Sequence, residues 1–218
     1  MDQIDKKLSV LIGTCDSYLK YVPNCVHLLN KYFAYDCKKL IVGETDKINF
    51  PGYDWCTPGK IQWGSRVKKA LSEITTEYTF FMLDDYYLSQ KLSVEFINWL
   101  LQFMTRENAN KITITTVPDW ANYRYLETID TIKRMSPFSE WLSSAQPAIW
   151  RTSHLKNVVQ ENYDPWDFEI IGSEKLKGKE NSHFVIKLDE PIYFNFVRKG
   201  NVLSPGWKEF LDRENIKL

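Results

Sequence analysis

Short apolar segments alternate with longer amphipathic stretches through the first half of the chain. Three apolar runs have the length and composition of buried strands, at residues 8–12, 40–42 and 78–83. Apolar residues at spacings of three and four predict helices after these strands, beginning near Val22, Trp63 and Phe96. Residues 111–116 alternate again as a strand. Because strands that alternate with helices form parallel sheets with crossover connections, we predict an α/β fold with a mostly parallel central sheet flanked by helices.

The regularity weakens in the second half of the chain. Residues 119–137 are polar and aromatic with no clean period, which predicts an irregular excursion over the sheet edge. Asp164 and Pro165 predict the cap and first position of a helix. Three other elements are expected, namely a strand at 145–150, a helix at 153–162 and a strand at 191–197. No repeat or low-complexity linker divides residues 1–218, so we expect one domain.

Composition excludes one class of partner and favours another. The 218 residues include 28 Lys and Arg against 28 Asp and Glu, so the formal net charge is zero. Because non-specific binding to nucleic acid depends on summed basic charge, we expect no nucleic-acid partner. Aromatic residues make up 15% of the chain, with 8 Trp, 12 Tyr and 12 Phe, which exceeds what a core requires. Amphipathic rings of this kind line sites for sugars, bases and other flat ligands.

The N-terminal residues and the cysteines indicate a cytoplasmic location. Charged residues stand where a signal peptide needs an apolar stretch, and no apolar run approaches the roughly 20 residues of a membrane span. The four cysteines lie far apart in sequence, without the close pairs of zinc sites or redox dithiols, at positions 15, 25, 37 and 56. We therefore expect reduced thiols. A peripheral contact with the inner face of the cell membrane, through an aromatic or basic patch, is compatible with this composition.

Polar and acidic residues follow the predicted strands. Ligands of an open parallel sheet bind beyond the carboxyl ends of its strands. The groups expected at that edge are Thr14, Asp16, Glu44, Asp84 and Asp85. The chain has neither a G-x-G-x-x-G motif nor a P-loop, which excludes the two commonest nucleotide-binding motifs of this fold class.

Asp84 and Asp85 are adjacent carboxylates at the end of an otherwise apolar strand. Two neighbouring negative charges are unfavourable unless a cation or a hydrogen-bonded ligand compensates them. Carboxylate oxygens suit Mg²⁺ or Mn²⁺ shared with a phosphate. The alternative interpretation is a turn in which the pair only leaves the strand and caps the segment that follows.

Several blocks of sequence together resemble a known family. They are SVLIGT at 9–14, WGSR at 63–66, AL at 70–71, the run at 77–88 that contains the acidic pair, and PWDFE at 165–169. In these blocks the chain is similar to bacterial glycosyltransferases of the GT-A type, particularly those of capsular or O-antigen polysaccharide synthesis. The resemblance covers roughly residues 8–173. It implies a Rossmann-like GT-A fold in which residues 1–117 hold a nucleotide sugar and residues 118–218 hold the acceptor.

The resemblance also implies a donor site at the strand ends. It places the nucleobase and ribose near Thr14, Asp16 and Glu44, and the nucleotide or its phosphates near Arg66. The pair that follows the third strand corresponds to the acidic motif of the family. Asp84 would then touch the ribose, and Asp85 would bind a divalent cation, Mn²⁺ or Mg²⁺.

Tyr86 occupies the third position of that motif, so the sequence departs from a strict Asp-x-Asp. His183 is a second candidate metal ligand, since some GT-A enzymes use a C-terminal histidine. The alternative for a lone histidine in a polar segment is simple exposure to solvent.

An inverting transfer also needs a base that removes the proton of the acceptor hydroxyl. The candidates are Glu169 and Asp167, and we favour Glu169. Asp167 would stand at the third helical position, where it reaches back toward the cap. Glu169, two residues further along, points to nearly the opposite side of the helix, so the two carboxylates are not expected to share one cavity. The alternative for Glu169 is a solvated helix surface.

Three functions are compatible with these residues. We favour transfer of a hexose from a nucleotide diphosphate sugar to a lipid-linked saccharide acceptor in surface polysaccharide assembly. A sugar-1-phosphate nucleotidyltransferase shares the architecture but needs a Gly-rich, basic loop after the first strand, which residues 13–16 do not supply. The third alternative is a non-catalytic module that binds a carbohydrate or a nucleotide.

Overall fold

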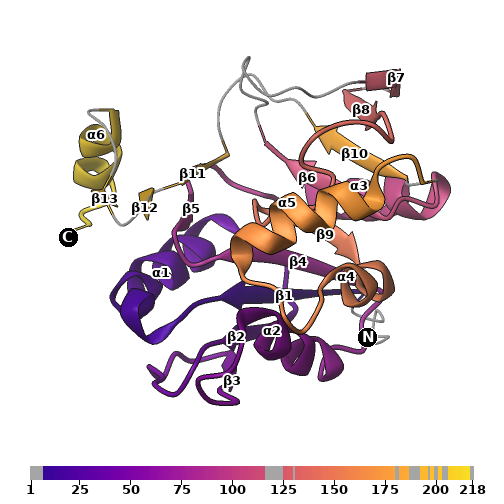
Figure 1. Ribbon diagram of the computed structural model, residues 1–218. Helices are drawn as coiled ribbons and strands as arrows, with labels where there is room; N and C mark the ends of the chain where they lie inside the picture. The colour runs from indigo at the N-terminus through magenta and orange to yellow at the C-terminus, as the bar shows by residue number, and fades with distance from the viewer. Residues whose placement is uncertain are drawn as a thin grey trace.

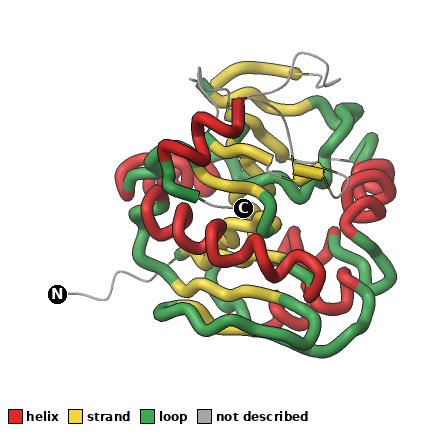
Figure 2. Tube along the Cα trace, turned by 90° about the vertical axis from the view of Figure 1, so that its left-hand side faces the viewer, coloured by secondary structure: helices red, strands yellow, loops and turns green. Residues whose placement is uncertain are grey.

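A computed structural model describes residues 7–115, 125–129, 131–179, 182–186, 192–195, 197–198, 201–202 and 206–216. A nine-stranded sheet forms the middle layer, and helices pack on both of its faces (Figures 1 and 2). The expected α/β architecture is confirmed.

The sheet is mostly parallel. Seven strands share one direction, whereas β8 and β9 are antiparallel to both of their neighbours. The spatial order is β3 (Tyr53–Cys56), β2 (Lys38–Val42), β1 (Leu8–Gly13), β4 (Tyr78–Leu83), β9 (Ala148–Arg151), β6 (Lys111–Ile114), β10 (His183–Ile186), β8 (Ile132–Met135) and β7 (Tyr125–Ile129). The parallel strands β1, β2 and β4 therefore end at the same edge.

The helices divide between the two faces of the sheet. The helical bounds are α1 (Val22–Tyr32), α2 (Trp63–Ser72), α3 (Val94–Arg106), α4 (Thr152–Val158), α5 (Pro165–Leu176) and α6 (Gly206–Arg213), with a short 3₁₀ helix at Asp16–Tyr21. Helices α1 and α3 pack in one core, and α2, α4 and α5 pack in the other. In Figure 1, α5 crosses in front of the sheet. Two further pairs of short strands are β5 (Tyr86–Leu88) with β11 (Tyr193–Asn195), and β12 (Val197–Arg198) with β13 (Asn201–Val202).

The first strand shows why the apolar runs are continuous. Val10 and Ile12 face the core with α1 and α3, whereas Leu11 faces the core with α2. A strand that is covered on both faces needs apolar side chains at successive positions, so its sequence does not alternate. The strands predicted at 8–12, 40–42 and 78–83 are all confirmed.

The second half differs from the sequence-based expectation in three places. Residues 125–129 and 132–135 form the hairpin β7–β8 rather than an irregular excursion. Of the expected segment 119–137, residues 119–124 and 130 lie outside the described residues. The strand expected at 145–150 is β9, which inserts antiparallel between β4 and β6. The helix expected at 153–162 ends at Val158.

In the first half of the chain, the strand β3 lacked a long apolar run and was not predicted.

None of the helices in the described part of the chain is long and apolar enough to cross a membrane.

Candidate functional site

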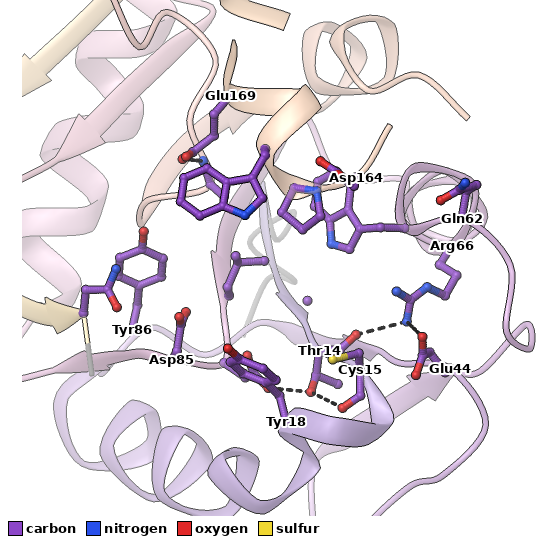
Figure 3. A pocket seen from close by; sticks show the side chains of 18 of the residues that line it. Thr14, Cys15, Tyr18, Glu44, Gln62, Arg66, Asp85, Tyr86, Asp164 and Glu169 are labelled. Atoms are coloured by element: carbon purple, nitrogen blue, oxygen red, sulfur yellow. Dashed lines mark hydrogen bonds and ion pairs between the residues drawn. The ribbon is translucent and has the colours of Figure 1, made fainter. Parts of the chain in front are cut away.

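A cavity of about 500 Å³ opens at the carboxyl ends of β1, β2 and β4. Its walls include residues that follow β1 and β2, the start of α2, the turn after β4, and the start of α5, with Ala145 and Asn195 completing the lining. Figure 3 shows Arg66 and Glu44 at one end of this cavity, and Asp85 and Glu169 toward the other end. Six sequence-predicted residues line it, namely Thr14, Glu44, Arg66, Asp84, Asp85 and Glu169.

Asp84 is a buried carboxyl group anchored to the first strand. Its Oδ2 accepts a hydrogen bond of 2.5 Å from the hydroxyl of Thr14, and its backbone amide donates to Gly13 O at 3.0 Å. Burial raises the pKa of Asp84 well above its usual value, and the bond from Thr14 opposes that rise. Asp84 therefore joins the ends of two neighbouring strands beneath the cavity.

Asp85 faces the cavity and has an unsatisfied oxygen. Its Oδ1 is buried and has no hydrogen-bond partner among the described residues. Burial raises the pKa of Asp85 to about 7, and the nearby negative charge of Glu169 adds to the rise. A buried carboxylate oxygen without a donor is the group that a cation or a ligand hydroxyl would satisfy.

Arg66 is the positive group of the cavity. Its Nη1 donates to Thr14 O at 3.2 Å and lies 3.5 Å from Glu44 Oε1. Its Nε is buried without a partner in the part of the chain that the structure describes. The guanidinium is therefore held by the ends of β1 and β2, with a donor left for a ligand.

Asp16 stands behind this wall and does not line the cavity. Its carboxylate accepts bonds from the hydroxyl of Thr45 at 2.6 Å and from the backbone amides of Thr45 and Asp46. The bonds from Thr45 lower the pKa of Asp16 to about 2. The backbone amide of Asp16 also donates to Glu44 Oε2 at 2.9 Å. Asp16 thus shapes the loop that presents Glu44.

The first turn of α5 separates Asp167 from Glu169. Asp164 and Asp167 form a reciprocal capping box, in which the Asp167 amide donates to Asp164 Oδ1 at 2.7 Å. Asp167 is half-buried and does not line the cavity. Glu169 points to the other side, where its Oε1 accepts bonds from the Ala145 amide at 2.8 Å and the Ser144 hydroxyl at 3.3 Å. Burial raises the pKa of Glu169. The capping role of Asp167 and its separation from Glu169 both agree with the prediction made from their spacing in sequence.

His183 is not brought to the cavity. It lies on β10, fully buried, with its Nε2 2.9 Å from Nε2 of His154. Burial lowers the pKa of His183 well below its usual value, which favours the neutral ring. The expectation of an exposed segment at this position is wrong, because residues 183–186 pair with β6 and β8 inside the sheet. Among the described residues, no group of three or more His, Cys, Asp and Glu side chains could hold a metal ion.

Two polar residues, one in the cavity wall and one inside the sheet, carried no clear sequence signal. Asn195 lines the cavity with a buried Oδ1 that has no partner among the described residues. Lys111 is fully buried on β6, although its strand was predicted. A lysine in an alternating strand indicates an exposed position, so only the tertiary structure identifies it. Within the segment expected to form an irregular excursion, the polar and aromatic residues Trp120, Tyr123 and Arg124 lie outside the described residues.

A close backbone approach joins the two sides of the cavity. Gly64, at the start of α2, donates its amide to Tyr163 O at 2.8 Å. A Cβ at this position would lie 1.9 Å from Gln160 O, so no side chain fits. The glycine of the WGSR block therefore lets α2, which carries Arg66, contact the turn that leads into α5.

No protein-family model and no curated protein matches the chain. Among solved structures, S. aureus TarS matches with a TM-score of 0.60 at 16% identity, over 88% of this chain and 37% of TarS. A TarS structure in complex with UDP-GlcNAc matches with a TM-score of 0.60 at 17% identity, over 90% of this chain and 60% of that one. A UDP-glucose pyrophosphorylase complexed with UDP-glucose matches with a TM-score of 0.58 at 8% identity, over 95% of this chain and 97% of that one.

The chain thus spans less than two thirds of either TarS chain. At these identities the likeness shows a shared fold. The expected GT-A type α/β fold is therefore confirmed at the level of architecture.

Proposed function

We propose that this protein is a glycosyltransferase that transfers a hexose from a nucleotide diphosphate sugar to a saccharide acceptor. The observation that carries the proposal is the cavity itself, which brings Arg66 and the acidic pair to one site with the half-buried side chain of Glu169. The two similar structures that hold UDP-GlcNAc and UDP-glucose support a nucleotide sugar as the ligand.

The donor would lie along the ends of β1, β2 and β4. Arg66 supplies a fixed positive charge and a free Nε–H for a phosphate or a nucleobase carbonyl. Glu44 is held by the Asp16 amide and can accept a bond from a ribose hydroxyl. Thr14 and Asp84, joined by a hydrogen bond, form the floor of this donor site.

A divalent cation fits this site only with help from the donor. Asp85 offers one unpartnered carboxylate oxygen, and Mg²⁺ is commonly bound by one or two carboxylates together with substrate phosphates. An Mn²⁺ or Mg²⁺ ion bound by Asp85 would offset the charge of the departing diphosphate. His183 is not part of this proposal, because its ring is buried against His154.

Glu169 is the proposed base for a transfer that inverts the anomeric centre. The acceptor oxygen forms its bond to the sugar C1 as the bond from C1 to the phosphate oxygen breaks. The nucleoside diphosphate leaves with the bonding electron pair, and the acceptor proton passes to Glu169. Both hydrogen bonds to this carboxylate reach Oε1, and neither involves Oε2, the proposed proton acceptor. A pKa raised by burial improves a carboxylate as a base.

The acceptor would approach beside α5. Trp166 lines the cavity and is 57% exposed, so its ring face is open to a sugar. Ile170, one turn further along, is 56% exposed and extends the apolar surface outward. This surface suits a lipid-linked saccharide in surface polysaccharide assembly, with the protein cytoplasmic at the inner face of the membrane.

A sugar-1-phosphate nucleotidyltransferase is the second candidate. The likeness to UDP-glucose pyrophosphorylase covers nearly the whole of both chains, which favours it. Against it, the residues that follow β1 include no glycine and no basic residue until Lys20, which is exposed. A triphosphate would therefore find no basic loop at the position where this reaction needs one.

The test is incubation of the purified protein with a panel of UDP, GDP and CDP sugars, with and without Mn²⁺. Release of nucleoside diphosphate, by transfer or slow hydrolysis, supports the glycosyltransferase. Formation of a nucleotide sugar and pyrophosphate from a nucleoside triphosphate and a sugar 1-phosphate supports the second candidate.

Saturable binding of a nucleotide sugar without either product identifies a binding module and contradicts both enzymes. Asp85→Asn is expected to weaken donor binding about tenfold or more. Asp54→Asn is the matched control, since Asp54 lies on β3 with a side chain that is 68% exposed. Unchanged donor affinity and unchanged Mn²⁺ dependence in Asp85→Asn would exclude the proposed cation site.

A further inference from the structure

A lysine buried within the central sheet is unused by the function proposed above. Lys111 lies on β6 and is 0% exposed. Its ammonium donates to the backbone carbonyls of Trp141 at 3.3 Å and Leu142 at 3.1 Å. It also lies 4.9 Å from the centroid of the Trp150 ring. Because a buried ammonium is costly unless its donors are satisfied, this arrangement needs an explanation.

The segment that Lys111 holds is strained. Trp141 has a φ of 58°, in the left-handed region that bulky side chains rarely adopt. Such a conformation persists only where the surrounding structure imposes it, and strained residues of this kind cluster at functional sites. The carbonyl of this same residue is one of the two groups that the ammonium binds.

The same segment continues to the proposed base. The Ser144 hydroxyl and the Ala145 amide are the two donors to Oε1 of Glu169. Between them and Trp141, the Ser143 amide donates to Ser173 Oγ on α5 at 2.9 Å, and Ser173 Oγ donates back to Ser143 O at 3.0 Å. Residues 141–145 are therefore fastened on one side by the lysine of β6 and on the other by α5.

We propose that Lys111 is a positioning residue for Glu169. Its ammonium fixes the strained segment 141–145, which presents two hydrogen-bond donors to the carboxylate of the base. The inference rests on the function proposed above for Glu169 and adds a residue to it. Lys111 itself does not line the cavity and acts only through the segment and through its charge.

The charges around Lys111 agree with this role. The titratable groups that act on it or feel its charge are Glu169 from α5, His154 from α4 and His183 from β10. Burial lowers the pKa of Lys111 to about 7, and the carboxylate of Glu169 opposes that decrease. The positive charge of Lys111 in turn lowers the pKa of Glu169 against the effect of burial. The two histidines have pKa values lowered by burial, so both are neutral near pH 7.

The test compares Lys111→Met, Ser173→Ala and the control Lys69→Met, an exposed lysine on α2. Amide exchange of residues 142–145 and the carboxyl pKa of Glu169 are measured by NMR in each folded protein. Lys111→Met is expected to speed exchange at Ala145 about tenfold or more and to raise the pKa of Glu169. Ser173→Ala is expected to speed the same exchange with a smaller change in that pKa, because the ammonium remains. The control changes neither.

If the glycosyltransferase reaction is observed, Lys111→Met should lower kcat about 10- to 100-fold with donor KM unchanged. Wild-type exchange at Ala145 together with a wild-type pKa of Glu169 in Lys111→Met would overturn the inference, whatever the reaction. If Lys111→Met does not fold, wild-type exchange and kcat in Ser173→Ala overturn it instead. A protein with no transferase activity in which these NMR changes occur contradicts the proposed function and leaves the positioning by Lys111 intact.

Discussion

The hydroxyl of Thr14 donates a hydrogen bond of 2.5 Å to Oδ2 of Asp84, 70 residues further along the chain. This bond joins the ends of β1 and β4 where the two strands lie side by side. Because Asp84 is buried, the bond supplies one of the donors that replace solvent around its carboxyl group. The cavity therefore rests on a floor that the two strands make together.

Thr14→Val is expected to destabilise the protein by about 1–3 kcal/mol, because a buried carboxyl loses its donor while the side-chain volume is kept. Urea unfolding at pH 7 measures the change. Thr45→Val removes the hydrogen bond to Asp16 on an exposed loop and serves as the control, with a smaller expected effect because water can replace the lost donor. Equal changes in the free energy of unfolding would show that the Thr14–Asp84 bond stabilises the protein no more than the exposed Thr45–Asp16 bond.

Glu169→Gln is expected to lower kcat by about 10²- to 10⁴-fold and to leave donor binding unchanged, because the amide cannot take the acceptor proton. Asp167→Asn is the matched control two residues away, outside the cavity and in the helix cap. It should lower stability by about 1 kcal/mol or less and keep turnover. Full turnover in Glu169→Gln would remove this residue from the mechanism.

Asp85 should make stability depend on pH in the metal-free protein. Burial raises its pKa to about 7, whereas the unfolded chain titrates it near 3.9. Between these pH values the folded protein holds a proton that the unfolded chain has released, so the free energy of unfolding falls as pH rises from about 4 to about 7. Asn carries no charge at any pH. Asp85→Asn should therefore be more stable than wild type at pH 8, by about 1–3 kcal/mol, with the difference vanishing near pH 4.

Urea unfolding of wild type, Asp85→Asn and the exposed control Asp54→Asn at several pH values from 4 to 8 measures this effect. If the difference in free energy of unfolding between wild type and Asp85→Asn stays constant with pH, burial does not disfavour the charged form of Asp85. The control should follow the wild type throughout.

Gly64→Ala is expected to destabilise the protein by about 3 kcal/mol or more, because the new methyl group meets the backbone oxygen of Gln160. The displacement would move α2 and Arg66 relative to α5, so donor affinity should fall as well. Thermal unfolding and nucleotide titration measure the two effects. Lys69→Ala, on the exposed face of the same helix, is the control. A Gly64→Ala protein with wild-type stability would mean that the contact with the 160–163 turn can open freely.

The local elements of the first half of the chain could be predicted because their signals are local. The strand at 78–83 was predicted with its observed bounds, since a strand buried on both faces must be apolar throughout. The cap at Asp164 could also be predicted, because capping depends on residue types at fixed spacing. The same spacing placed Glu169 and Asp167 on different sides of α5.

Other features depend on which segments become neighbours. His183 stands in a polar stretch of sequence, yet pairing with β6 and β8 buries it. The strand β9 inserts between β4 and β6. Both partners come from distant parts of the chain, so no local sequence pattern predicts this order.

Residue types and their periodicity alone determined the order of strands and helices in the first half of the chain and the acidic pair at the end of β4, because hydrophobic spacing and capping act over a few residues. Only the tertiary structure decided that Lys111 is buried and that its ammonium meets the segment bonded to Glu169. The physical reason is that burial and charge pairing are set by contacts between residues far apart in the chain, whose free energies do not appear in any single segment.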